Sequence, residues 1–210
     1  MIIKSFAAGP FDANNYLVID EESKEAMLVD CSDYVQEIVD IVKEMELNVK
    51  YILITHGHFD HILGINQMKA VLGAEVYVSQ DDIILLENIN QAASHFAGDT
   101  IREIPKYDHV YEPGIVFALG NEKFTVVKTP GHTEGSVCIR GAHVLFSGDT
   151  LFKGTFGRTD LFGGSIKKLM HSIMNVLFYM PDDTIVYTGH NEFTTIGYEK
   201  ANNEINNYMK

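Results

Sequence analysis

The chain has 210 residues, 46% of them apolar, which is enough to bury a sizeable core, and no linker or low-complexity tract divides it. We therefore predict one domain over residues 1–210. Its formal charge of −13 disfavours nucleic acid as a partner, because phosphate binding needs clustered Lys and Arg and the 16 such residues are scattered. The sequence has no apolar run of membrane-spanning length and no secretion signal, which predicts a cytoplasmic protein without a membrane partner.

The first part of the chain alternates strand and helix patterns. A polar turn separates two short β-rich runs, which predicts a hairpin, and apolar residues at helical spacing follow. A nearly all-apolar strand comes next, then a second helix closed by Gly73 as its C-cap, and another strand. These elements are predicted, in chain order, at residues 15–20 and 25–30, 33–46, 49–55, 61–73 and 74–79.

The second part begins with residues 81–110, which are predicted to form a helix followed by an irregular stretch. The β pattern then returns in four runs, and a helix with Pro181 beyond its end precedes a last strand. The four strands are predicted at residues 115–120, 123–129, 136–141 and 143–148, the helix at 165–178 and the last strand at 184–189.

Five of the nine histidines lie within a few residues of the end of an apolar strand. Loops at one edge of a layered α/β fold converge, so groups that are distant in sequence can meet there. The other histidines, His95, His109, His143 and His171, are expected to be ordinary surface or core residues. Four strand ends thus deliver seven potential ligands: His56, His58, Asp60, His61, His132, Asp149 and His190.

The seven-residue motif THGHFDH supplies four of these groups. His56 and His58 are two apart on extended backbone and point the same way, whereas Asp60 and His61 lie at the turn into a helix and face elsewhere. This geometry suits two adjacent metal ions. Imidazoles and carboxylates without thiolate suit zinc, iron or manganese, and we expect zinc.

The motif THGHFDH occurs together with four further stretches, TPGHTEGSVCI, SGDTLFKGTFGRTD, YTGH and TTIGYEKANN. In this combination the sequence resembles the metallo-β-lactamase superfamily, and its glyoxalase II-like branch in particular. The resemblance runs from residue 9 to residue 203. It implies an α/β fold, the αββα four-layer sandwich of two mixed sheets flanked by helices. It also implies two divalent metal ions, the first held by His56, His58 and His132, the second by Asp60, His61 and His190, with Asp149 bridging.

The activity that the resemblance implies is hydrolysis by a metal-bound hydroxide of a small-molecule thioester such as S-lactoylglutathione, or of a related ester. Asp60 or Asp149 would orient the attacking hydroxide and count as catalytic. A departing thiolate needs little protonation, which fits the lack of a conspicuous general acid. The protein is expected to be a monomer or a homodimer.

Substrate recognition is expected from residues 81–110 and 151–164. Lys153, Phe156 and Arg158 are the candidate contacts in the second segment. Lys153 would meet a substrate carboxylate or simply be solvated, and Arg158 would pair with Asp160.

The chain departs from glyoxalase II in three places, and the second weakens the glutathione assignment more than the hydrolase assignment. Gly57 stands where those enzymes have a histidine that is not a ligand. The 20 residues after His190 leave no room for the helical domain that helps to bind glutathione. Cys31 stands where relatives usually have proline, and we expect a structural thiol near the site. With Cys138 far away in sequence, neither a disulfide scaffold nor a cysteine zinc site is indicated.

The alternative function is that of the persulfide dioxygenases of the same superfamily, which use one iron on the first three histidines. A flavodiiron reductase is disfavoured because His58 stands where that class has glutamate, and a nuclease by the charge of −13. A β-lactamase is disfavoured by His61 beside Asp60. A metal-binding module without turnover stays open.

Overall fold

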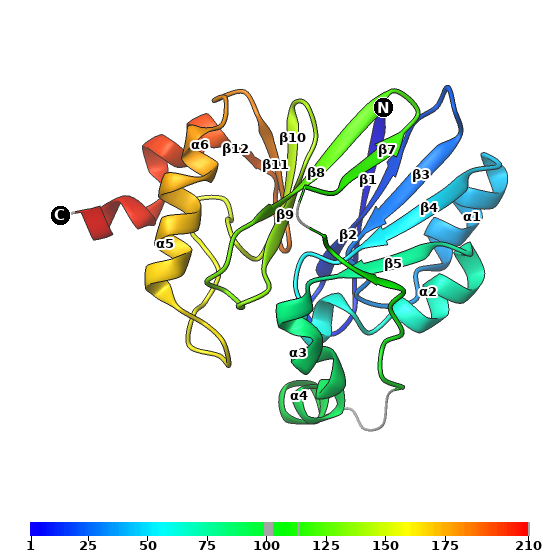
Figure 1. Ribbon diagram of the computed structural model, residues 1–210, viewed down its shortest axis with the longest axis horizontal. Coiled ribbons are helices and arrows are strands. Elements are labelled where there is room, and N and C mark those ends of the chain that lie inside the picture. The colour runs from blue at the N-terminus through cyan, green and yellow to red at the C-terminus, as the bar shows by residue number, and fades with distance from the viewer. Residues whose placement is uncertain (99–102, 113, 210) are drawn as a thin grey trace.

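The protein is described by a computed structural model that covers residues 1–98, 103–112 and 114–209. Two six-stranded sheets face each other, with helices on their outer sides (Figure 1). The first sheet has the order β1-β2-β3-β4-β5-β6, and β1 to β3 are antiparallel whereas β3 to β6 are parallel. Its strands are β1 (Ile2–Ala8), β2 (Ala13–Ile19), β3 (Glu25–Val29), β4 (Asn48–Leu53), β5 (Glu75–Val78) and β6 (His109–Val110).

The second sheet has the order β12-β11-β10-β9-β8-β7 and is also mixed, because β10 and β11 are parallel while the other neighbours are antiparallel. Its strands are β7 (Val116–Leu119), β8 (Glu122–Lys128), β9 (Val137–Arg140), β10 (Val144–Gly148), β11 (Ile185–Thr188) and β12 (Thr194–Thr195).

Helices cover the outer face of each sheet (Figure 1). On the first sheet lie α1 (Gln36–Glu44) and α2 (Ile65–Leu72), and on the second lie α5 (Ile166–Asn175) and α6 (Ile196–Asn202). The pair α3 (Ile83–Glu87) and α4 (Ile89–Ala97) lies beyond one end of the sheets. This confirms the expected αββα sandwich. The 3₁₀ turns are η1 (Phe59–His61), η2 (Gln80–Asp82), η3 (Leu177–Tyr179) and η4 (Glu204–Met209).

Apolar side chains fill three layers. Val18, Met27, Phe124 and Phe146 belong to a cluster between the two sheets, and each is almost fully buried. Further clusters lie between each sheet and its outer helices. Strand β2 is buried along its whole length, since its alternate side chains enter two different layers. Burying one large apolar side chain is worth about 1.5–3 kcal/mol, so these layers dominate the stability of the fold.

Several predicted elements match the structure. The hairpin forms from β2 and β3, and the amphipathic helix forms as the shorter α1. Gly73 closes α2 in the left-handed conformation, with φ of 68°, as a C-cap glycine should. The helix itself begins only at Ile65, because residues 59–61 form the 3₁₀ turn η1.

Other elements differ from the prediction. Residues 81–110 hold two helices and the short strand β6 rather than one helix and an irregular stretch, because α3 ends at Asn88, whose backbone leaves the helical region. Residues 99–102 of that segment lie outside the described residues. Strand β1 and helix α6 were not anticipated. Within the described ranges, no helix has the length and apolar character needed to cross a membrane.

Candidate metal centre

Four chain segments bring the predicted ligands to one edge of the sandwich. Residues 55–61 follow β4 of the first sheet, whereas His132 lies between β8 and β9 of the second. Asp149 follows β10 directly, and His190 follows β11. Because both sheets deliver their strand ends to the same edge, residues as distant in sequence as His61 and His190, 129 positions apart, meet there.

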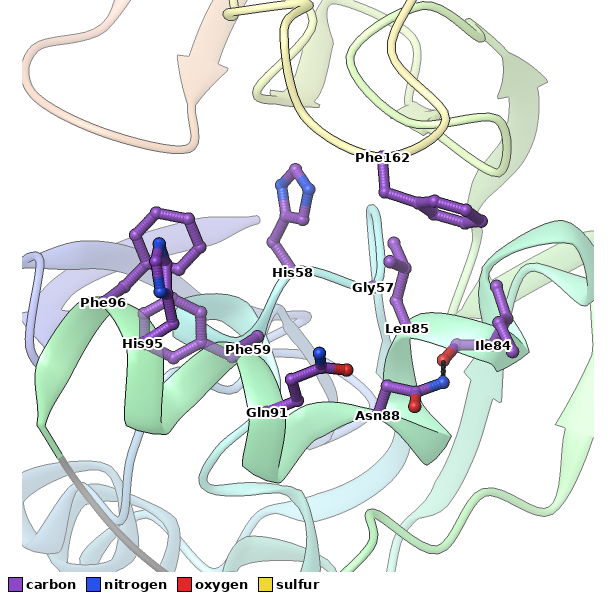
Figure 2. Close-up of a pocket in the computed structure, with 11 residues that line it drawn as sticks. Gly57, His58, Phe59, Ile84, Leu85, Asn88, Gln91, His95, Phe96 and Phe162 are labelled. Carbon is purple, nitrogen blue, oxygen red and sulfur yellow. Dashed lines mark hydrogen bonds between the residues drawn. The ribbon is translucent and has the colours of Figure 1, made fainter.

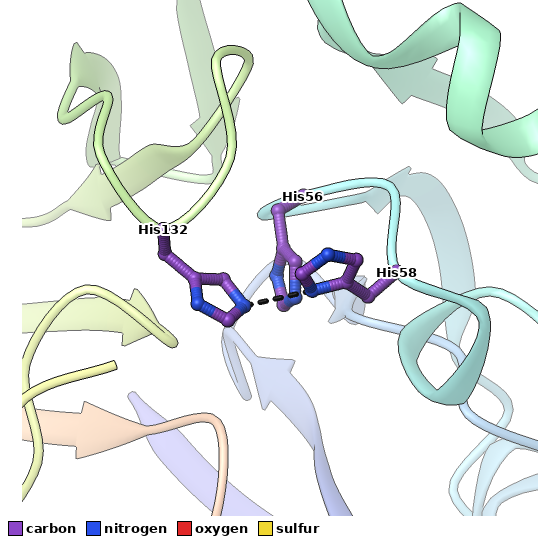
Figure 3. A group of neighbouring side chains, drawn as sticks. All are labelled: His56, His58 and His132. Atoms are coloured by element: carbon purple, nitrogen blue, oxygen red, sulfur yellow. Dashed lines mark hydrogen bonds between the residues drawn. The ribbon is translucent and has the colours of Figure 1, made fainter. Parts of the chain in front are cut away.

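The first group consists of His56, His58 and His132, which come from opposite sheets and point at one another (Figure 3). One nitrogen of each ring lies within 4.8 Å of the others. Nδ1 of His58 is 2.8 Å from Nε2 of His132. His56 and His132 are buried and His58 is partly exposed, so the group lies at the floor of an opening.

The second group consists of Asp60, His61 and His190, whose candidate ligand atoms also lie within 4.8 Å of one another. Nε2 of His190 lies 3.2 Å from Nε2 of His61 and 3.4 Å from Oδ2 of Asp60. The 3₁₀ turn η1 carries Asp60 and His61. The His61 ring lies 4.3 Å from the His56 ring, and His56, His61 and Asp149 also bring ligand atoms within 4.8 Å of one another, so the two groups adjoin.

Asp149 lies between the two groups. Its Oδ1 is 3.4 Å from Nε2 of His61, and its Oδ2 is 3.5 Å from Nε2 of both His132 and His190. Glycine at position 189 makes this approach possible, because a Cβ there would lie 2.0 Å from Oδ1 of Asp149. One carboxylate therefore faces members of both groups.

Four of the five imidazoles are fixed through the ring nitrogen that faces away from the centre. The partners of these Nδ1 atoms are Thr55 Oγ1 for His56 at 3.1 Å, Asp30 Oδ2 for His61 at 2.9 Å, the Arg158 carbonyl for His132 at 2.8 Å and the Phe11 carbonyl for His190 at 3.1 Å. Such contacts orient a histidine so that Nε2 is presented to a metal. His58 differs, since its Nδ1 faces the centre.

Two buried carboxylates that the sequence analysis did not identify hold the ligand segments. Asp30 accepts hydrogen bonds from the Thr55 amide at 2.7 Å and the Thr55 hydroxyl at 2.8 Å, besides its contact with His61. Asp82 accepts from the amides of Gly57 and Gly135, both at 2.8 Å, and from the Thr133 hydroxyl at 2.7 Å. Asp82 thus ties the turn of His56 and His58 to the turn of His132.

The imidazole nitrogens and carboxylate oxygens of the two groups are suited to binding metal cations. Nε2 of His56 and Oδ1 of Asp149 are buried and have no hydrogen-bond partner in the protein, which is costly unless another group satisfies them. Imidazole nitrogens and carboxylate oxygens are ligands that zinc, iron and manganese accept. The residues present could therefore hold one ion in each group, with Asp149 facing both.

The protonation states of His56, His58 and Asp149 also favour metal binding. Burial and the neighbouring His61 hold the pKa of His56 well below 6.5, and burial with His132 lowers the pKa of His58 to about 3. Both rings are then neutral at pH 7, as ligation requires. Burial opposes ionisation of Asp149, but the facing His61 outweighs it and holds the pKa of Asp149 well below 3.8.

A cavity of about 190 Å³ opens onto this centre. Arg158 lines it while pairing with Asp160 at 2.7 Å, as expected. Lys153 and Phe156 are not among its described lining residues: Lys153 pairs with Glu192, and Phe156 packs against the Tyr208 ring at 5.9 Å. Cys31 is fully buried behind the site, and its backbone amide bonds the His61 carbonyl at 2.9 Å.

The comparisons with known proteins agree with this architecture. A family model described as the metallo-beta-lactamase superfamily matches residues 8–191, and the chain belongs to this superfamily of metallohydrolases. It is 33% identical over 206 residues to the Haemophilus influenzae protein named hydroxyacylglutathione hydrolase GloC, covering 97% of each chain.

Two solved structures are similar over nearly their whole length. One is BLEG-1, described as a B3 metallo-beta-lactamase, with a TM-score of 0.89 and 33% identity over 97% of this chain and 98% of that one. The other is TTHA1623 in a di-iron-bound form, with a TM-score of 0.84 and 31% identity over 96% of this chain and 98% of that one.

Proposed function

We propose that the protein is a dinuclear metal-dependent hydrolase that cleaves thioesters. The observation that carries the proposal is the pair of three-residue groups, His56 with His58 and His132, and Asp60 with His61 and His190, which share Asp149 between them. The similarity to a protein named hydroxyacylglutathione hydrolase supports a thioester rather than another acyl compound.

Two ions held by these groups would supply Lewis acidity, which polarises an acyl carbonyl and lowers the pKa of water toward neutrality. The protein itself contributes orientation. Asp60 is buried and Asp149 partly buried beside the imidazoles, and their ionised carboxylate oxygens accept hydrogen bonds only, so they can align a water for attack on the acyl carbon. Arg158, which pairs with Asp160, lines the same cavity.

A departing thiolate is stable enough to leave without a proton, which suits this site. Among the described lining residues of the cavity, every histidine belongs to a ligand group, and no lysine or cysteine is present. An alkoxide or amine leaving group would need an acid placed there. The chemistry of the lining therefore favours thioesters.

A second candidate is an oxidoreductase with one iron on His56, His58 and His132. The specific observation in its favour is that these three side chains form a complete group without the other four. The similar structure in a di-iron-bound form also makes iron a realistic metal. The second group and the shared Asp149 would then have no role, which is why the hydrolase is preferred.

One purified sample decides between the candidates. The protein is expressed under defined supply of zinc, iron or manganese, and its metals are counted. It is then assayed for hydrolysis of S-lactoylglutathione and of the neutral thioester S-benzyl thioacetate, for oxygen uptake with glutathione persulfide and for opening of a chromogenic cephalosporin. We expect two metals per chain and thioester cleavage. One iron with oxygen uptake, or cephalosporin opening without thioester cleavage, would contradict the proposal.

A matched pair of variants separates the centre from the rest of the protein. His58→Ala removes a ligand of the first group and should abolish thioester turnover and lower the metal content. His171→Ala removes an exposed histidine on α5, away from the centre, and should leave both unchanged.

A further inference from the structure

A second, larger cavity of about 640 Å³ adjoins the metal centre (Figure 2). Helices α3 and α4 form its floor, the segment that carries Phe162 lies across from them, and His58 projects between the two. Its volume is in the range of pockets that bind small molecules.

The lining of this cavity is predominantly apolar. Phe59 and Phe96 are stacked with ring centroids 6.0 Å apart, and Ile84 and Leu85 of α3 line it beside them. Three of the lining side chains are unusually exposed for large apolar residues, Ile84 at 45%, Phe96 at 42% and Phe162 at 71%. Apolar surface gathered around a cavity is typical of a binding site rather than of a bare surface.

The described lining residues carry few polar side chains. Among the described residues that line the cavity there is no Lys, Arg, Asp or Glu, and its polar side chains are Asn88, Gln91 and the two imidazoles of His58 and His95. Glutathione carries two carboxylates and an ammonium group, and a charge placed here would lose water without gaining a partner. The lining therefore favours an uncharged occupant.

The cavity is continuous with the cleft over the metal centre. Four residues line both: His58, Phe59, Ala92 and Phe96. A molecule that reacts at the centre can thus extend directly between α4 and Phe162.

We propose that this cavity binds an uncharged apolar group of the substrate, on the acyl or the thiol side of the bond that is cleaved. The inference rests on the proposed thioester hydrolysis and narrows its substrate class to thioesters with an aromatic or branched aliphatic group. Residues of α3 and α4, with Phe162, then set specificity without touching the reacting atoms.

A set of neutral thioesters tests this. Acetyl and phenylacetyl thioesters of N-acetylcysteamine differ on the acyl side, and S-benzyl thioacetate differs from the first on the thiol side. We expect kcat/KM to rise by about 10-fold or more for one of the two aromatic substrates, within the range that apolar pockets provide. A rise on either side supports the proposal and assigns the cavity to that side. Equal values for all three, or a preference for S-lactoylglutathione, would overturn it.

Binding can be followed without turnover, because the chain contains no tryptophan. Phe162→Trp places a fluorescent reporter in the cavity, and Tyr179→Trp places one on η3, where Tyr179 is 83% exposed and outside the cavity lining. The probes are the two ketones in which methylene replaces sulfur in the phenylacetyl and S-benzyl thioesters. We expect the tryptophan fluorescence to change saturably with ketone concentration in Phe162→Trp and to stay constant in Tyr179→Trp. If no thioester is cleaved but this reporter still responds, the proposed function fails and the cavity assignment stands.

A pair of matched variants places a negative charge either in the cavity lining or outside it. Ile84→Glu should lower kcat/KM for the favoured aromatic thioester about 10-fold more than for the acetyl one, because the carboxylate must lose water when an apolar group enters. Val71→Glu makes the same change at a residue of α2 that is 42% exposed and outside the cavity lining, and should not change this ratio. An unchanged ratio in Ile84→Glu contradicts the proposal.

Discussion

Asp82 accepts a hydrogen bond of 2.8 Å from the backbone amide of Gly57, the residue between His56 and His58. The same carboxylate accepts from the Thr133 hydroxyl, next to His132. A Cβ on Gly57 would lie 2.9 Å from the Cβ of Asp82, so the turn can pack this closely only as glycine. One buried side chain therefore fixes the spacing of the first metal group.

Replacing Asp82 tests this coupling. In Asp82→Asn the amide nitrogen replaces one of the two acceptor oxygens, so a donor from Gly57, Thr133 or Gly135 loses its partner. We expect about 10–100-fold weaker metal binding, as for other residues that orient ligands, and about 1–3 kcal/mol lower stability. Chelator competition and urea unfolding measure the two effects. Asp81→Asn, at the exposed neighbouring position, is the control. Wild-type metal affinity in Asp82→Asn would refute the role of Asp82 in fixing the first metal group.

A methyl group at position 189 should disturb the shared carboxylate directly. The Cβ of Gly189→Ala would lie 2.0 Å from Oδ1 of Asp149, so Asp149 must move away from His61. We expect fewer than two metals per chain by elemental analysis. Gly73→Ala is the control, because nothing lies within 4 Å of the added Cβ. It costs only the strain of a left-handed alanine, about 1–2 kcal/mol, and should keep the full metal content.

Metal affinity should rise with pH. Burial lowers the pKa of His61, but Asp149 and Asp30 outweigh it and hold that pKa well above 6.5; the pKa of His190 is likewise raised, against burial, by Asp60 and Asp149. The metal-free protein therefore keeps protons on these rings above pH 6.5, and a metal ion must displace them. His56 and His58 are already neutral there. Competition titrations with zinc from pH 6.5 to 8.5 should show the second ion gaining more affinity than the first, and equal gains would speak against this assignment of protons.

Removing the metals should lower stability without unfolding the chain. The cores between and outside the sheets hold the fold together, so the stripped protein should keep its far-UV circular dichroism. A ligand present at 100 times its Kd adds about 2.7 kcal/mol, so Tm should fall by several degrees on chelation and recover when metal is returned. A Tm that is insensitive to chelator would mean that the ligand groups do not bind metal in the folded state.

The candidate metal ligands that the structure brings together could be predicted from the sequence, because each lies near the end of an apolar strand. Asp82 obeys no such rule. It lies 25 residues from Gly57 and 51 from Thr133, and it is one of two adjacent aspartates in a polar turn. What it contacts depends on how the two sheets face each other, which a local pattern does not specify.

Which residues line the cavities beside the candidate metal centre was harder to predict from the sequence than the candidate ligands. Lys153 and Phe156 follow Asp149 closely in sequence, yet one pairs with Glu192 and the other packs against Tyr208. The loop folds back on the C-terminal part of the chain, which places these side chains away from the described cavities. His95, expected to be an ordinary histidine, lines the larger cavity because α4 turns that face toward the centre.

Anomalous scattering at the metal absorption edge, measured from crystals of the metal-loaded protein, tests the proposed two-metal centre most directly. We predict two peaks, one among His56, His58 and His132 and the other among Asp60, His61 and His190, with Asp149 between them. A single peak at the three histidines, with the second group empty under saturating metal, would contradict it.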